Sequence, residues 1–108
     1  MEFVSPIMRF SDVKMLPQGK RHPDGKQAIL DFGKYQLSII SNEMSYGGAA
    51  GLYEIGVFKG YGTDDEKMVS LPGITREDDA VSGYLTPNHV NGIMQKMFLI
   101  TKNTPEQV

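Results

Sequence analysis

Residues 27–41, QAILDFGKYQLSIIS, carry the clearest local signal of the chain, two β-rich runs on either side of Gly33 and Lys34. A glycine in the first position of a two-residue turn permits the positive φ of a type II′ turn, so this stretch predicts a β-hairpin. Apolar and polar residues alternate along it, and we expect the apolar parity to face the core and the other parity to face water. The apolar parity consists of Leu30, Phe32, Tyr35, Leu37 and Ile39.

Further strands are expected on both sides of the hairpin. Residues 52–58, LYEIGVF, alternate as a third strand, and residues 67–71 form a short fourth strand, which ends because Pro72 cannot donate to a continuing ladder. Residues 8–14 alternate weakly and predict a short edge strand. Residues 16–26, LPQGKRHPDGK, have the proline and glycine content of an exposed connector.

The C-terminal part of the chain predicts an amphipathic helix. Thr86 is the expected N-cap, and Pro87 suits the first helical position, where its missing amide hydrogen would have no partner in the helix. At helical spacing, one apolar stripe is formed by Val90, Ile93, Met94, Met97 and Phe98. A helix of this length is marginal alone in water, so we expect it to dock on the sheet.

These elements predict an α+β fold, a two-layer sandwich in which an antiparallel sheet of about four strands carries one C-terminal helix on one face. Parallel βαβ units are disfavoured because no helix-length crossover separates the strands. The 108 residues suit a single domain over 1–108. Because Met8 also offers a natural start, residues 1–7 are considered as a disordered extension, and residues 102–108 as a polar tail.

Composition excludes several classes of function. With 11 Lys and Arg against 13 Asp and Glu, the chain lacks the positive excess that neutralising a phosphate backbone demands, so broad, non-specific binding to nucleic acid is disfavoured. The absence of cysteine excludes disulfides, thiolate nucleophiles and cysteine-based metal sites. No signal peptide or membrane-spanning run is visible, so a cytoplasmic location is expected.

Catalytic and metal-binding patterns are scarce. The chain has two histidines, His22 and His89, which are both expected on the surface, and it has no nucleophile elbow. We therefore expect no metal or cofactor, and an enzyme is the less favoured interpretation.

Two acidic clusters are expected in solvated turns. Consecutive carboxylates in a turn seldom converge on one ion, and the EF-hand spacing is absent. The alternative is that the two acidic turns imitate a nucleic acid or complement a basic partner and steer association by charge. The clusters are Asp64, Asp65 and Glu66, and Glu77, Asp78 and Asp79.

The glycine-rich stretch before the third strand, SYGGAAG at residues 45–51, raises the question of a ligand loop. No helix follows whose amides could hold a phosphate, and the P-loop ending is missing, so a mobile or tightly turned loop between two strands is the main interpretation. A second interpretation is that the loop region contacts a partner protein, and phosphate binding is the third. The candidate partner-binding residues are Met44, Tyr46, Gly47, Gly48, Tyr53 and Tyr61.

Gly92 and Leu99 lie on the helix face opposite the apolar stripe. A glycine inside an exposed helix costs about 1 kcal/mol relative to alanine. Two explanations stay open. Leu99 belongs to a fraying helix end or to a second small contact, or the two residues admit close contact with a second copy of the chain, which would make the protein a homo-oligomer.

Several segments resemble small proteins that are encoded by tailed phages and prophages and have no assigned role. The segments are SYGG (45–48), GLYE (51–54) and GYLT (83–86), which leads into the helix with Val90. The resemblance covers the C-terminal two thirds and transfers no functional residue. It implies an accessory protein in the cytoplasm of an infected bacterium that binds a host or defence component without catalysis.

The alternative function is a protein that binds a small molecule or a nucleotide, and an enzyme is one form of it. In that case the loop from Gly47 to Gly51 would form a wall of the pocket.

Overall fold

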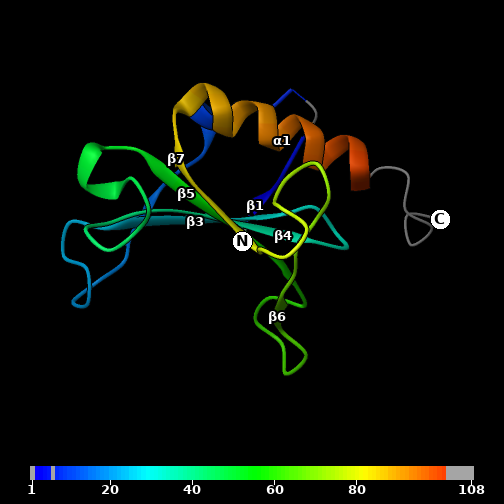
Figure 1. The fold of residues 1–108 in the computed structure, drawn as a ribbon, viewed down its shortest axis with the longest axis horizontal. Helices are drawn as coiled ribbons and strands as arrows, with labels where there is room; N and C mark the ends of the chain where they lie inside the picture. The colour runs from blue at the N-terminus through cyan, green and yellow to red at the C-terminus, as the bar shows by residue number, and fades with distance from the viewer. Residues whose placement is uncertain (1, 6, 102–108) are drawn as a thin grey trace.

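Three long strands, β3 (Lys26–Asp31), β4 (Gln36–Ser41) and β5 (Tyr53–Lys59), form the centre of an antiparallel sheet. The helix α1 (Pro87–Thr101) lies across one face of this sheet (Figure 1). The predicted α+β architecture of two layers is therefore confirmed. The computed structural model describes residues 2–5 and 7–101.

Short strands complete both edges of the sheet. β1 (Glu2–Phe3) and β2 (Leu16–Pro17) pair with opposite ends of β3, and β6 (Lys67–Met68) and β7 (Val81–Leu85) pair with opposite ends of β5. Only β1 runs parallel to its neighbour among the described strands. Besides β1 the sheet has six strands that pair antiparallel, more than the four or so predicted. The sequence carries no signal for β1 and β2 because each has two residues, or for β7 because its pairing shifts register.

One local prediction is wrong, and a second is right only in part. The expected edge strand over 8–14 is instead a 3-10 turn, η1 (Phe10–Asp12), in which the Arg9 amide donates to Asp12 Oδ2 at 3.0 Å. This turn packs against α1 and buries Phe10. The expected fourth strand over 67–71 ends at Met68, and Leu71 turns into the core.

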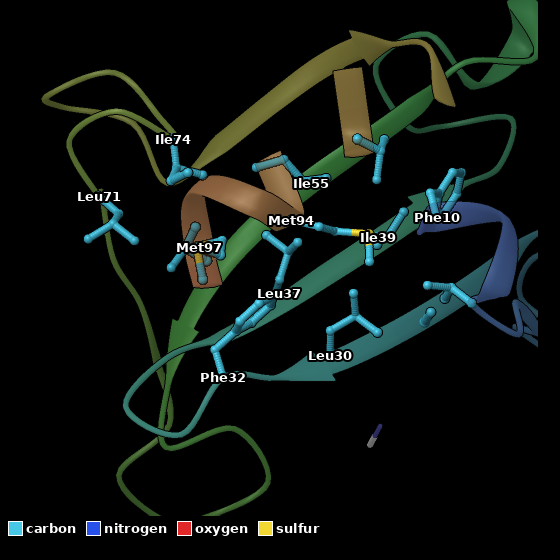
Figure 2. Packing of buried hydrophobic residues seen from close by; sticks show 14 residues of the cluster. Phe10, Leu30, Phe32, Leu37, Ile39, Ile55, Leu71, Ile74, Met94 and Met97 are labelled. Carbon is cyan, nitrogen blue, oxygen red and sulfur yellow. The ribbon is translucent and has the colours of Figure 1, made fainter. Parts of the chain in front are cut away.

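The predicted hairpin is present between β3 and β4. Gly33 has φ +86, and the Phe32 amide donates to the Tyr35 carbonyl at 2.9 Å, which closes the two-residue turn. Leu30 lies opposite Leu37, so the apolar parity faces the helix as expected. Figure 2 shows this core from close by. Its fully buried members include Leu30, Leu37, Ile39, Ile55, Val57, Val90, Met94 and Met97.

The sheet face away from the helix is less exposed to solvent than the alternating pattern predicts. Gln36 and Ser38 are only 6% and 8% exposed. The side-chain amide of Gln27 donates from Nε2 to Ser38 Oγ at 3.1 Å. Gln36 Oε1 accepts a hydrogen bond from the Tyr61 backbone amide at 3.0 Å. Hydrogen bonding along the sheet and from the β5–β6 turn therefore satisfies these polar side chains where water was expected.

The helix begins as predicted, and it also uses a histidine. Thr86 Oγ1 accepts the His89 amide at 3.2 Å, and the Thr86 amide donates to His89 Nδ1 at 3.3 Å. This reciprocal pair has the form of a capping box with histidine in place of the usual glutamate. His89 is exposed, as expected, but it has a structural role at the N-terminus of α1.

Candidate functional site

A hollow of about 580 Å³ lies beside β7 at one edge of the sheet. Residues 81–84 of β7 form one wall, and residues 73–76 with Asp79 form the other. Tyr46 reaches it from the loop between β4 and β5. Segments that are distant in sequence thus meet at one concave surface.

The loop between β4 and β5 contains the glycine-rich stretch, and it is a tightly hydrogen-bonded turn, as the main interpretation expected. Asn42 Oδ1 accepts the amides of Met44 and Ser45, both at 2.8 Å, and its side-chain amide donates to Gln18 Oε1 at 2.9 Å. The short 3-10 turn η2 (Gly48–Ala50) follows. A Cβ on Gly48 would stand 1.7 Å from the Asn42 carbonyl oxygen, so this close packing requires glycine.

Tyr46 and Tyr84 stand at the rim of the hollow, 62% and 66% exposed. The Tyr84 amide donates to the Tyr46 carbonyl at 3.1 Å. A Cβ on Gly83 would stand 2.3 Å from Tyr46 Cβ, which leaves room only for glycine. Met44, on the same loop as Tyr46, is 78% exposed. We call Met44, Tyr46 and Tyr84 the tyrosine rim.

Tyr84 has an unusual backbone conformation. Its φ is 56°, and among the described residues no other non-glycine residue has a positive φ. The residue lies where the pairing between β5 and β7 shifts register, as at a β-bulge, and the left-handed position of such a bulge is usually glycine. This conformation costs an L-residue about 1–2 kcal/mol. Strain of this kind is concentrated at functional sites, which directs attention to the exposed ring.

The hollow is rich in hydrogen-bond donors. Asp79 Oδ1 already accepts the Val81 amide at 3.0 Å, and Thr75 Oγ1 already accepts the Leu71 amide at 2.8 Å. By contrast, the exposed Arg76 guanidinium has no ion-pair partner within residues 2–5 and 7–101. Lys96 does not line the hollow, but its Nζ donates at 3.4 Å to the carbonyl of Gly73, which is a lining residue.

A side-chain hydrogen bond links the glycine-rich loop to the connector before β3. His22 Nδ1 lies 2.8 Å from Glu43 Oε1. The hydrogen bond with His22, supported by a backbone hydrogen bond, lowers the pKa of the exposed Glu43 carboxyl. His22, which was expected on the surface, is partly buried by this packing.

The structure brings together only part of the predicted partner surface. Met44, Tyr46, Gly47 and Gly48 share one loop. The Tyr53 ring instead packs edge-on against Phe10, with centroids 4.8 Å apart, on the helix side of the sheet.

Tyr61 lies beyond the opposite end of β5. Its ring packs edge-on against Phe58 at 5.2 Å, so it is separate from the tyrosine rim. Neither Tyr84 nor Arg76 was predicted as a site residue. Tyr84 entered the sequence analysis only as part of the segment GYLT, which was noted for its resemblance to phage proteins. No spacing rule connects it to Tyr46.

The two acidic clusters occupy separate turns. Figure 1 shows the β5–β6 turn projecting below the sheet, while the β6–β7 segment runs back toward the helix. Glu66 Oε1 accepts the Gly62 amide at 2.8 Å. Within the described ranges, no group of three His, Cys, Asp or Glu side chains is arranged to hold a metal ion. All six acidic residues are exposed, namely Asp64, Asp65, Glu66, Glu77, Asp78 and Asp79.

The outer face of α1 is open. Leu99 is 54% exposed, and a Cβ on Gly92 would have no atom within 4 Å. Packing inside one chain therefore does not require the glycine. In the part of the chain that the structure describes, no helix has the length and apolar character to cross a bilayer.

Comparison of the chain with protein-family models, with curated proteins and with solved structures finds no match.

Proposed function

We propose that this protein is a small binding module that contacts a partner protein through the tyrosine rim. The observation that carries the proposal is Tyr84, an exposed aromatic residue held in a strained backbone conformation next to the equally exposed Tyr46. A fold that needed only stability would place glycine at this position.

The chemistry of the rim suits a protein interface. Tyrosine and methionine are enriched at such interfaces. Tyrosine offers a large, rigid contact area at a low cost in side-chain entropy, while methionine adapts its shape to a partner. The hydrogen bonds of Asn42 and the close packing of Gly83 fix the backbone that carries the rim. Such preorganisation reduces the entropy lost on binding.

The biological setting is proposed from the resemblance of the segments SYGG, GLYE and GYLT to phage-encoded proteins. On this basis, the protein is an accessory product that acts in the cytoplasm of an infected bacterium. Its partner is a host or defence component, and its action is binding without catalysis.

An affinity experiment tests the proposal. The immobilised protein is incubated with bacterial lysate, and retained proteins are identified by mass spectrometry. The double variant Tyr46→Ala, Tyr84→Ala should lose the specific partner by about 30-fold or more in affinity, as expected when interface hot spots are truncated.

The matched control is Tyr61→Ala, a tyrosine removed from the other end of β5, which should retain the partner. Equal retention by the wild type and the double variant would refute the role of the rim.

A second candidate function is favoured by the hollow itself. Its volume of about 580 Å³ lies within the range of roughly 300–1,000 Å³ typical of small-molecule sites. A ligand there would contact β7 and Tyr46. The residues from Gly47 to Gly51 are not among those that line the hollow, so they would not form its wall, although Gly47 packs closely against the Tyr84 backbone.

A further inference from the structure

We propose that the hollow beside β7 binds a nucleotide, with the base on the tyrosine rim and the phosphate at Arg76. This site goes beyond the proposed partner function and does not depend on it. The recognised chemistry is a planar ring joined to a phosphate, which a free nucleotide and the end of a strand both provide.

The anion preference follows from how the polar groups of the hollow are already used. Asp79 Oδ1 accepts the Val81 amide, which occupies one oxygen of the carboxylate that lines the hollow while its negative charge remains. Arg76 retains all its donors among the described residues. A guanidinium binds phosphate through two parallel hydrogen bonds, and Lys96 at the Gly73 carbonyl adds positive charge nearby.

Hydroxyl groups extend this donor set. Ser82 and both rim tyrosines line the hollow, and their side chains make no hydrogen bond with any described residue. They remain available to a ligand's phosphate or sugar oxygens.

The ring preference follows from Tyr46 and Tyr84. The aromatic contacts among the described residues join Phe10 with Tyr53 and Phe58 with Tyr61, so the rim tyrosines do not stack on other aromatic residues. Both are more than half exposed and border the same hollow. Aromatic side chains of this kind stack on any base, because every base has a π-face.

Charge limits the size of the ligand. Glu77 and Asp78 follow Arg76 directly and are exposed, and the whole chain carries a net charge of −2. A long polyanion would be repelled, whereas one or two phosphates can be neutralised locally by Arg76 and Lys96. The hollow therefore suits a single nucleotide.

Calorimetric and NMR titrations test this site with four probes: AMP, adenosine, inorganic phosphate and a five-residue oligodeoxyadenylate. AMP should bind at least about tenfold more tightly than adenosine or phosphate, and should shift the amide signals of residues 73–84. Arg76→Gln should weaken AMP about tenfold and leave adenosine unchanged, since it removes a charge-assisted contact to phosphate. Tyr84→Gly should weaken both AMP and adenosine.

Arg21→Gln, an exposed arginine in the connector, is the matched control and should bind AMP as the wild type does. Because the acidic surroundings repel a longer polyanion, the oligonucleotide should bind more weakly than AMP; equal or tighter binding would contradict the charge argument and indicate a strand end as the source. Absence of AMP binding at millimolar concentration, or an unchanged affinity in Arg76→Gln, would overturn the proposal.

The two proposals can fail separately. Arg76 does not belong to the tyrosine rim, so Arg76→Gln should still retain the partner protein in the affinity experiment. If the protein binds its partner but no nucleotide, only the proposal of a nucleotide site in the hollow fails. If it binds nucleotide but no partner, only the proposed partner function fails.

Discussion

At Tyr84 the chain has a backbone conformation that favours glycine, and it places a large aromatic side chain there. Its amide is held by the Tyr46 carbonyl, and the neighbouring Gly83 lets the two backbones touch. These contacts maintain φ at 56° against the intrinsic preference of an L-residue. The side chain itself stays 66% exposed, so its burial does not compensate for the strain.

This arrangement predicts a difference between two variants at Tyr84. Tyr84→Ala keeps the strained backbone, whereas Tyr84→Gly relieves it, so the glycine variant should be more stable by about 1 kcal/mol. Urea unfolding followed by circular dichroism measures the difference. A glycine variant no more stable than the alanine variant would show that the conformation carries no strain. The glycine variant should nevertheless lose binding at the rim.

Individual site residues could be predicted only where the local sequence carries a signal. Met44 and Tyr46 lie beside a glycine-rich stretch, so composition pointed to them. Tyr84 and Arg76 join the site because β7 pairs with β5 across a register shift, a long-range contact that no local spacing encodes. Tyr53 was assigned to the rim region, but its parity in β5 turns it toward Phe10.

At the scale of elements, predictability followed the strength of the periodic pattern and of the capping signals. The β3–β4 hairpin, β5 and α1 were predicted because each has several residues of one parity or helical stripe. The strands β1, β2 and β6 have two residues each, and tertiary pairing alone defines them. β7 contains Gly83 and a bulge, which removes the alternation that identifies a strand.

Two glycines in different elements should respond to alanine in opposite ways. In α1, Gly92 faces open space, so Gly92→Ala should raise the free energy of unfolding by about 0.5–1 kcal/mol. In β7, Gly83→Ala brings a Cβ to 2.3 Å from Tyr46 Cβ, so it should lower stability by about 1–3 kcal/mol as the loop is displaced.

Chemical denaturation of both variants provides the comparison. Sedimentation of Gly92→Ala gives a further result, because a second copy packed closely on this face would be displaced by the added methyl group. If Gly92→Ala were less stable than the wild type and sedimented at a lower mass, a second copy of the chain would occupy this helix face in solution. That result would contradict the expected gain in stability.

At the scale of the whole molecule, one apolar layer joins the sheet to the helix. Leu71 and Ile74 from the β6–β7 segment also enter this layer, as Figure 2 shows, so one wall of the hollow is continuous with the core. Side-chain burial therefore decreases from the core residues below α1 to the exposed tyrosines at the rim. The wall of the hollow is thus joined to the core through Ile74.

Because the helix and sheet share this layer, they should unfold together. Met97 in α1 is fully buried, so Met97→Ala should cost about 2–5 kcal/mol. Met44→Ala, at a methionine that is 78% exposed, is the matched control and should change stability by less than about 0.5 kcal/mol. Unfolding is followed by far-ultraviolet dichroism for the helix and by tyrosine fluorescence for the sheet. Coincident transitions in the wild type and both variants are expected, whereas a separate early loss of helical signal would show that α1 and the sheet are not one cooperative unit.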